Sequence, residues 1–288
     1  MPWWLKLAAK LVIARLPVPY GFWRRVGLLT HGDMAQPAYA VSAFRRHRAA
    51  LAAQEARSWT GLEVGPGNSV ASALVAAASG ASRYYLIDRA RYATPDLAPY
   101  RTLAAHLASL GMTPPDLRGI DTLDGLLAAC NAAYLTEGVS SFRAVPDGSI
   151  DLSWSQAVVE HVRAGELAGL AKALFRAARP GGASSHRIDL QDHLACSINN
   201  LRFPAWFWES ALVVGNPVYT NRLRPAQLTQ AFAQAGWQVS RAAVDRWTAL
   251  PVAREKLDRA FRALPESDLL AHGMDLVLQR APLPETGH

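Results

Sequence analysis

Leu62-Glu63-Val64-Gly65-Pro66-Gly67-Asn68-Ser69 is the stretch that decides the fold of this chain. The residues leading into it, from Trp59, predict a short buried strand, and Val70 to Ser79 carries Ala, Leu and Val at helical spacing. A strand, a glycine turn and a helix therefore follow one another. The two glycines let the backbone approach a ligand where a Cβ would collide, and the helix start adds unpaired N–H groups and the positive end of a dipole.

A second apolar run, Arg83 to Ile87, ends at Asp88, about 20 residues beyond the glycine turn. An acidic residue at the tip of the second strand can bind both hydroxyls of a ribose, so the pairing predicts a nucleoside-containing cofactor. A dinucleotide-binding turn would read G-x-G-x-x-G, but Val70 stands where the third glycine would be. This difference disfavours an NAD-dependent oxidoreductase.

The turn resembles the E-x-G-x-G motif of class I S-adenosylmethionine (SAM)-dependent methyltransferases, with Glu63 as its acidic residue. Two later stretches are also similar to that family: Pro146 to Ser155 with Glu160-His161-Val162, and Arg179-Pro180-Gly181-Gly182. They resemble the family's fourth strand with its following helix, and the turn into the fifth strand. The resemblance runs from Trp59 to the C-terminus and is to bacterial methyltransferases of the type 11 kind.

The resemblance implies an α/β fold, namely the Rossmann-like class I methyltransferase fold: a seven-stranded, mostly parallel sheet with an antiparallel last strand, plus a helical N-terminal cap. The alternation of strand and helix patterns also indicates a mainly parallel sheet. The predicted strands lie near residues 60–64, 83–87, 140–144, 150–154, 183–189, 237–244 and 274–280. The predicted helices lie near 38–57, 68–79, 97–110, 121–133, 157–178, 225–235 and 253–264.

Two parts of the chain lie outside the minimal fold. Residues 1–55 contain no strand pattern and are predicted to form a helical cap or lid, while 56–288 form the cofactor-binding catalytic domain. An aromatic-rich insertion at about 192–224 follows the fifth strand. Because ligands of open α/β sheets bind outside the carboxyl ends of the strands, the insertion is expected on the substrate side. Its aromatic residues either contact substrate or fill a second small core.

The resemblance implies SAM as cofactor and S-adenosylhomocysteine as product. Asp88 is predicted to bind the ribose hydroxyls and Arg89 to lie along the adenine. The predicted cofactor contacts are Glu63, Gly65, Pro66, Gly67, Asp88, Arg89, Ser155 and Gln156. Relatives often place an acidic residue after the third strand to bind the adenine amino group, but the strand predicted at 140–144 has no acid beside it, since Phe142-Arg143-Ala144-Val145 occupies that region.

A hydroxyl acceptor would benefit from a general base with a pKa near neutrality, and histidine suits that role. The predicted catalytic residues are His161, after the fourth strand, and His186, in the fifth; a structural role for each is the alternative. Asp189 is three residues beyond His186, so on a strand the two face opposite sides. The predicted substrate contacts are His31, Asp189, His193, Trp208, Tyr219, Asn221 and Arg222. No spacing matches a zinc motif, so no metal is expected.

The composition restricts the partners. The 288 residues include 30 Lys and Arg and 23 Asp and Glu, so the chain is basic, and half of the residues are hydrophobic. A basic chain can meet nucleic acid, anionic lipid or an acidic substrate, or its arginine can reflect a GC-rich genome. No dense basic run occurs, so no nucleic-acid partner is expected. Cys130 and Cys196 lie far apart in the sequence with no CxxC motif, which favours free thiols in the cytoplasm.

The first fifteen residues, Met1 to Arg15, form an apolar run that is too short and too often interrupted by lysine to cross a bilayer. A helix packed on the catalytic domain as part of a lid is favoured over a helix that lies on a membrane surface.

The sequence thus predicts a cytoplasmic SAM-dependent methyltransferase. The expected acceptor is a small molecule or glycan, and O-methylation of a hydroxyl is the favoured reaction. Two alternatives stay open: N- or C-methylation of a small metabolite, and a non-catalytic protein that keeps the fold as a binding or scaffold module. The sequence leaves the oligomeric state undetermined.

Overall fold

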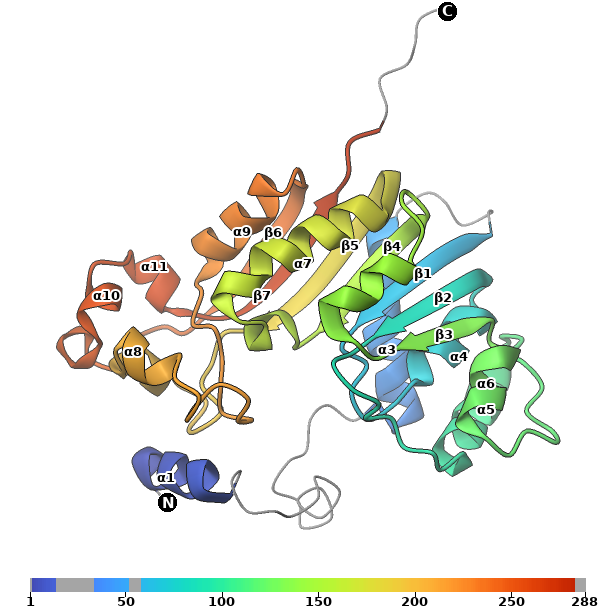
Figure 1. The fold of residues 1–288 in the computed structure, drawn as a ribbon, viewed down its shortest axis with the longest axis horizontal. Helices are drawn as coiled ribbons and strands as arrows, with labels where there is room; N and C mark the ends of the chain where they lie inside the picture. Colours follow the sequence, from blue (N-terminus) through green and yellow to red (C-terminus); the bar gives the residue numbers. More distant parts are fainter. Residues whose placement is uncertain (1, 14–33, 52–57, 283–288) are drawn as a thin grey trace, which may run out of the picture.

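The structure is a computed structural model, and it describes residues 2–13, 34–51 and 58–282 (Figure 1). Seven strands form one sheet in the order β3-β2-β1-β4-β5-β7-β6. Their bounds are β1 Trp59–Val64, β2 Ala81–Ile87, β3 Ala132–Leu135, β4 Ile150–Gln156, β5 Ala178–Asp189, β6 Gln238–Arg246 and β7 Ala271–Gln279. The pairs from β3 to β5 are parallel, and β7 is antiparallel to both neighbours. The predicted α/β fold class is confirmed.

Helices connect the strands. The longer α-helices are α1 Trp3–Ile13, α3 Pro37–Arg48, α4 Ala71–Ala78, α5 Ala98–Ser109, α6 Leu123–Ala129, α7 Ala164–Ala177 and α9 Pro225–Gln234. The four-residue α-helices are α8 Ala205–Trp208, α10 Arg259–Arg262 and α11 Glu266–Leu269. The 3₁₀ segments are η1 Ala49–Leu51, η2 Gly138–Ala144, η3 Val159–His161, η4 Asn199–Arg202 and η5 Arg254–Lys256.

The third strand is not where the sequence pattern predicted it. Residues 140–144 belong to the 3₁₀ segment η2, and β3 is the four-residue stretch Ala132–Leu135, part of which was predicted as the end of a helix. All four residues of β3 are half-buried, since β3 is an edge strand. A strand this short, without alternating burial, gives no period that a sequence pattern can reveal.

Two predicted helices also differ from the structure. The helix predicted at 157–178 begins as the single 3₁₀ turn η3, and α7 starts only at Ala164. The helix predicted at 253–264 is broken into η5 and α10, with α11 following. Pro265 and Pro251 bracket this segment, and proline disfavours helical backbone in the residue before it.

Two apolar cores lie on opposite faces of the sheet (Figure 1). One packs α3, α4, α5 and α6 against β1, β2 and β4, with Trp154 and Tyr84 among its largest fully buried side chains. The other packs α7 and α9 against β1, β4, β5 and β7. The helix α3 lies in the first core through Ala40, Val41 and Phe44. That half of the predicted N-terminal cap therefore covers the sheet; the boundary at residue 55 and the lid role stay predictions.

The segment between β5 and α9 builds a third, smaller core. Trp208, Val213, Val218 and Tyr219 pack there against Leu7 of α1. A fourth cluster, which includes Ile198, Leu201 and Leu269, joins the start of this segment to the β6–β7 connection. Apolar side chains of the insertion thus fill a second core, which was one of the two predicted alternatives.

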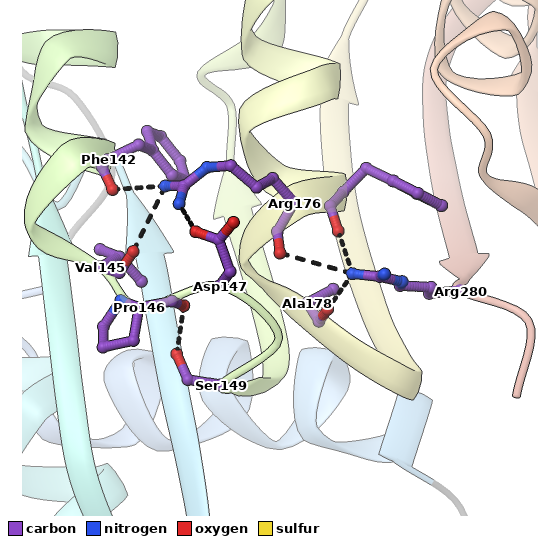
Figure 2. Close-up of polar contacts among 9 residues, drawn as sticks. Phe142, Val145, Pro146, Asp147, Ser149, Arg176, Ala178 and Arg280 are labelled. Carbon is purple, nitrogen blue, oxygen red and sulfur yellow. Dashed lines mark hydrogen bonds and ion pairs between the residues drawn. The ribbon is translucent and has the colours of Figure 1, made fainter. Parts of the chain in front are cut away.

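Two arginines fix the end of α7 against the neighbouring strands (Figure 2). Arg280, just after β7, donates from Nη1 to the carbonyl oxygens of Ala178 at 2.7 Å and Phe175 at 3.0 Å. Arg176 donates from Nη2 to the carbonyl of Phe142 at 2.6 Å and forms an ion pair with Asp147. The last carbonyls of a helix have no partner within it, so Arg280 satisfies the Phe175 acceptor, while the Arg176 side chain joins α7 to the carbonyl oxygen of Phe142 in η2.

Replacement of Arg280 with alanine removes its hydrogen bonds to the carbonyl oxygens of Phe175 and Ala178, whereas the carbonyls of Arg176 and Ala177 keep the backbone N–H groups of Gly148 and Ser149. We expect Arg280→Ala to lower the free energy of unfolding by about 1–3 kcal/mol, measured by urea denaturation. Arg118→Ala is the matched control, because Arg118 pairs with Asp116 on the surface and should leave the midpoint unchanged. Equal midpoints for wild type and Arg280→Ala would contradict the proposed capping.

Candidate functional site

The glycine turn after β1 has the backbone that the sequence predicts. Gly65 and Gly67 have positive φ angles of +73° and +61°. A Cβ added to Gly65 would lie 2.5 Å from Cγ2 of Val158, so the turn packs closely on the loop after β4. A Cβ added to Gly67 would meet nothing within 4 Å. Gly65 is therefore required by packing, whereas Gly67 borders open space at the carboxyl edge of the sheet.

Asp88 joins the loops that follow the first three strands. Its Oδ2 accepts a hydrogen bond from the backbone N–H of Gly67 at 3.0 Å, and its Oδ1 accepts from the N–H of Arg89 at 2.7 Å. Its backbone carbonyl accepts from the N–H of Gly138 at 2.8 Å. Burial raises the pKa of Asp88, and the two backbone hydrogen bonds oppose that rise. Asp88 therefore lies next to the glycine turn, and its binding of a ribose stays a prediction.

Glu63 lies in β1 and points toward α4. It is buried, and the hydroxyl of Ser72 donates to its Oε2. Burial raises the pKa of Glu63 to about 8, with a further contribution from the nearby Asp88. At neutral pH this carboxyl group is therefore largely protonated, and it can donate as well as accept a hydrogen bond.

Glu137 is a candidate residue that the sequence pattern missed. It follows β3 directly and is exposed beside the loop that carries Asp88, where it forms an ion pair with Arg143. The sequence pattern predicts the third strand at 140–144, so Glu137 stands before that strand in the prediction and not after it. The structure thus places an acid after the third strand, where the sequence analysis found none.

His47 of α3 is a second residue that the pattern missed. Its Nε2 lies 3.0 Å from Oε1 of Gln156, and its Nδ1 lies 2.8 Å from Oγ of Ser185. Its ring stacks on Trp154 with centroids 4.6 Å apart. Burial lowers the pKa of His47 to about 4, so the ring is neutral and orients the Gln156 amide. Its place within an ordinary amphipathic helix gave no signal of this contact.

His161 and His193 form a pair beside the β4 and β5 ends. His161 Nδ1 lies 2.8 Å from the carbonyl oxygen of Tyr219, so this nitrogen carries the proton, and its Nε2 lies 3.3 Å from Nε2 of His193. The rings stack with centroids 5.0 Å apart. Both side chains are half-buried. His161 lies in η3, three residues after Val158, which packs on Gly65. The histidine pair is thus joined to the glycine turn by one short loop.

Glu160 is buried between η3 and the end of β5. Its Oε1 accepts from the N–H of Asp189 at 3.2 Å, while its Oε2 has no partner. Asn200 Oδ1 and Arg222 Nε are also buried without a partner, and the three residues line one cavity of about 10 Å³. That is room for one water molecule, which would hydrogen-bond to these three groups. Burial raises the pKa of Glu160 to about 8.

His186 and Ser155 do not have the predicted roles. The side chain of His186 is buried in β5, where its Nδ1 lies 2.8 Å from Oγ of Ser155 and its ring stacks on Phe232 of α9. Burial lowers the pKa of His186 to about 3. A histidine enclosed in the core cannot take a proton from a substrate, and the buried Ser155 hydroxyl faces His186 instead of a cofactor. Gln156, the next residue, is half-buried at the strand end.

Several predicted substrate residues of the insertion are structural instead. Trp208 is fully buried and donates from Nε1 to the carbonyl of Thr220, and the Tyr219 hydroxyl donates to Glu209. Asn221 donates from Nδ2 to the carbonyls that flank His161, at Val159 and Val162.

Two members of the insertion border an open groove. Asn221 and Arg222 line a cavity of about 380 Å³ between α7, α8 and α10. Arg222 lies beside the rings of Trp208 and Phe261 and donates from Nη1 to the carbonyl of Phe203 at 2.6 Å. Asp189, also predicted, is half-buried near the histidine pair, and burial raises its pKa. His31 lies outside the described residues.

Two features are absent from the described ranges. In residues 2–13, 34–51 and 58–282, no group of three or more His, Cys, Asp or Glu side chains is placed to hold a metal ion. Within the same ranges, no helix has the length and apolar character needed to cross a membrane.

No family model and no curated protein matches the chain. Solved structures with a similar arrangement include a SAM-dependent methyltransferase of Methanosarcina mazei, 15% identical over 80% of this chain and 94% of that chain, with a TM-score of 0.48. A phosphoethanolamine N-methyltransferase of Haemonchus contortus, solved with S-adenosylhomocysteine, is 13% identical over 84% and 53%, with a TM-score of 0.47. The [4+2]-cyclase SpnF is 13% identical over 85% and 83%, with a TM-score of 0.46.

The raised pKa of Glu160 predicts a pH-dependent stability. A carboxyl group whose folded pKa lies above its unfolded value contributes stability that is full below about pH 4.5 and is lost as the pH rises through about 8. Glu160→Gln keeps an acceptor for Asp189 and cannot ionise. Between these pH values, the free energy of unfolding of the wild type should fall relative to the variant by up to about 1.4 kcal/mol per pH unit.

Urea denaturation at several pH values measures this difference. Glu137→Gln is the control, since Glu137 is exposed, and its curve should stay parallel to that of the wild type. Parallel curves for Glu160→Gln as well would show that the pKa of Glu160 is the same in the folded and unfolded states, which would contradict the raised folded pKa.

Proposed function

We propose that this chain is a SAM-dependent methyltransferase that methylates a hydroxyl group of a small molecule or glycan. The observation that supports this best is the glycine turn after β1, in which Gly67 faces open space and donates its N–H to Asp88. The turn stands at the carboxyl edge of a parallel sheet, where ligands of open α/β folds bind. The strand order with an antiparallel β7 adds to this support.

The residues of the turn fit a nucleoside with an attached amino acid. Each carboxylate oxygen of Asp88 accepts one backbone hydrogen bond and keeps a further lone pair, so the two oxygens can accept from both ribose hydroxyls. Glu137 would accept from the adenine amino group, with Arg89 beside the base. The protonated carboxyl of Glu63 and the amide of Gln156 would hold the methionine end. Gly67 supplies the space that a side chain would fill.

Bound SAM would supply an electrophilic methyl group on a sulfonium. A hydroxyl acceptor aligned with that methyl group would have to give up its proton, so a base of the protein would be needed beside it. His161 suits this step, since its Nδ1–H is held by the Tyr219 carbonyl and its Nε2 carries the lone pair. His193, 3.3 Å from that nitrogen, would orient it and share the resulting charge.

The histidine pair favours oxygen as the acceptor atom. A neutral amine is nucleophilic without a base, so N-methylation requires only alignment, whereas a hydroxyl gains from proton removal. C-methylation of a small metabolite and a non-catalytic role of the same fold are the rival functions. Binding of the cofactor distinguishes any methyltransferase from the non-catalytic role. The effect of a His161 substitution on kcat distinguishes base-assisted O-methylation from a reaction that needs only alignment.

Calorimetric titration with S-adenosylhomocysteine tests the cofactor site. We expect saturable binding by the wild type and a loss of at least about tenfold in affinity for Gly67→Ala and Asp88→Ala. The Gly67 variant places a methyl group in the open space beside the turn, and the Asp88 variant removes the carboxylate that would accept from the ribose. Gly80→Ala is the matched control: Gly80 also has a positive φ, of +82°, and open space around its Cβ position, but lies at the far end of α4.

The control variant should bind like the wild type, although both glycine variants carry similar backbone strain. Equal losses in Gly67→Ala and Gly80→Ala would mean that strain, and not the cradle, is responsible. A folded wild type that binds neither S-adenosylhomocysteine nor SAM would overturn the methyltransferase proposal and favour the scaffold role.

Transfer of labelled methyl groups from SAM to a panel of sugars and phenols tests the base. With an accepted hydroxyl compound, His161→Gln should lower kcat by about 10²–10⁴ while S-adenosylhomocysteine binding stays intact. The loss should shrink as the pH rises, because the acceptor then ionises without help. An unchanged kcat would favour alignment alone, and methylation of amines only would favour the N-methyltransferase alternative.

A further inference from the structure

The helix α1 has an apolar face that points away from the rest of the molecule. Trp4, Leu5, Ala8 and Val12 share this face at helical spacing, and the exposed fractions of Trp4 and Val12 are 58% and 63%. A helix on the surface of a globular protein usually presents polar residues to water on this side. The outer face of α1 therefore has the composition of a contact surface.

The opposite face of α1 is already used, so the orientation of the helix is fixed. Leu7 is buried in the core of the insertion, and the ring of Trp3 meets Phe203 edge-on with centroids 6.0 Å apart. Lys10 donates from Nζ to the carbonyl of His193 at 3.0 Å, and Asn216 donates to the carbonyl of Lys10 at 3.0 Å. The apolar outer face thus remains turned outward while α1 is held in place.

Further apolar surface lies on the insertion to which α1 is attached. Trp206 of α8 is 78% exposed, and its neighbour Phe207 packs in the same small core as Leu7. Eight large apolar side chains are exposed within the described ranges, and five of them belong to α1 or to residues 206–212. The other three, Leu110, Val139 and Val239, lie singly on separate elements. This concentration distinguishes the α1 region from scattered surface hydrophobics.

The charged side chains of α1 are all basic, namely Lys6 and Lys10. On the insertion side, Arg202 lies 5.1 Å from the centroid of the Trp3 ring. A surface of tryptophan and aliphatic side chains bordered by cations is complementary to the interface of an anionic bilayer, where tryptophan rings sit at headgroup level.

We propose that the outer face of α1, together with Trp206, docks on the surface of an anionic lipid bilayer. With 11 residues, α1 is about 16 Å long, roughly half the thickness of the hydrocarbon core, so it lies on the membrane and does not cross it. The contact is independent of the chemistry proposed for the site. Because Lys10 bonds the carbonyl of His193, docking holds the histidine pair close to the lipid surface.

Flotation of the full-length protein with lipid vesicles tests this docking. We expect the wild type to float with vesicles that mix phosphatidylglycerol and phosphatidylcholine, to bind phosphatidylcholine alone much less, and to dissociate as salt rises. The double variant Trp4→Ser/Val12→Ser should lower the partition coefficient by about tenfold or more. Leu110→Ser/Val239→Ser is the matched control, since it removes exposed apolar side chains elsewhere and should float like the wild type.

A charge variant provides a second measurement. Lys6→Glu leaves the apolar face intact and should weaken binding to phosphatidylglycerol vesicles, because it reverses one positive charge of α1; Lys6 is half-buried, so the melting temperature is measured alongside. Equal flotation of wild type and Trp4→Ser/Val12→Ser, or no flotation with anionic vesicles, would overturn the proposal. Light scattering that shows a dimer lost in that variant, without vesicle binding, would assign the face to a second copy of the chain.

Discussion

The hydrogen bond from the Gly67 N–H to the Asp88 carboxylate is the contact on which the carboxyl edge of the sheet depends. It joins the loops after β1 and β2, and the Asp88 carbonyl extends the connection to Gly138 after β3. Val158 adds the loop after β4 by packing where a Cβ of Gly65 would be. Four loops therefore have their positions set by one turn that needs left-handed backbone at two residues, which only glycine adopts without strain.

Burial of ionisable groups around this edge has an energetic cost. Glu63 and Glu160 both have pKa values raised to about 8, and that of His47 is lowered to about 4, in each case chiefly by burial. Each group is kept neutral near pH 7, so it is a hydrogen-bonding group of fixed direction without the desolvation penalty of a buried charge. Perturbed groups of this kind gather where a site must be polar yet closed to water, and here they flank the turn and the histidine pair.

The sequence predicted what is carried by strong local patterns. The strands β1 and β2 follow from apolar runs that end in glycine or acid, and β4 and β5 follow from the resemblance of their sequences to a known family; all four strands appear in the structure. The sequence prediction failed at β3, because four half-buried residues at the edge of a sheet show no alternation of polar and apolar side chains. Glu137 was missed because it follows this strand. The prediction also failed at His186 and Trp208, because a polar or aromatic residue gives no sign of whether its side chain meets the core or a ligand.

The insertion after β5 connects the candidate base His161 to the N-terminal helix α1. Asn221 donates from its side chain to the carbonyls of Val159 and Val162, and its own N–H donates to the Glu160 carbonyl. These three bonds hold the 3₁₀ turn that carries His161 against the insertion. On its other side the insertion holds α1 through Leu7 and Asn216. The same segment therefore positions the candidate base and the exposed N-terminal helix, and a displacement of α1 would reach His161 through Lys10 and His193. The polar contacts of Asn221 and His193 both hold the turn η3, and they keep their geometry only if the insertion is rigid. The close-packed aromatic side chains of the insertion provide that rigidity.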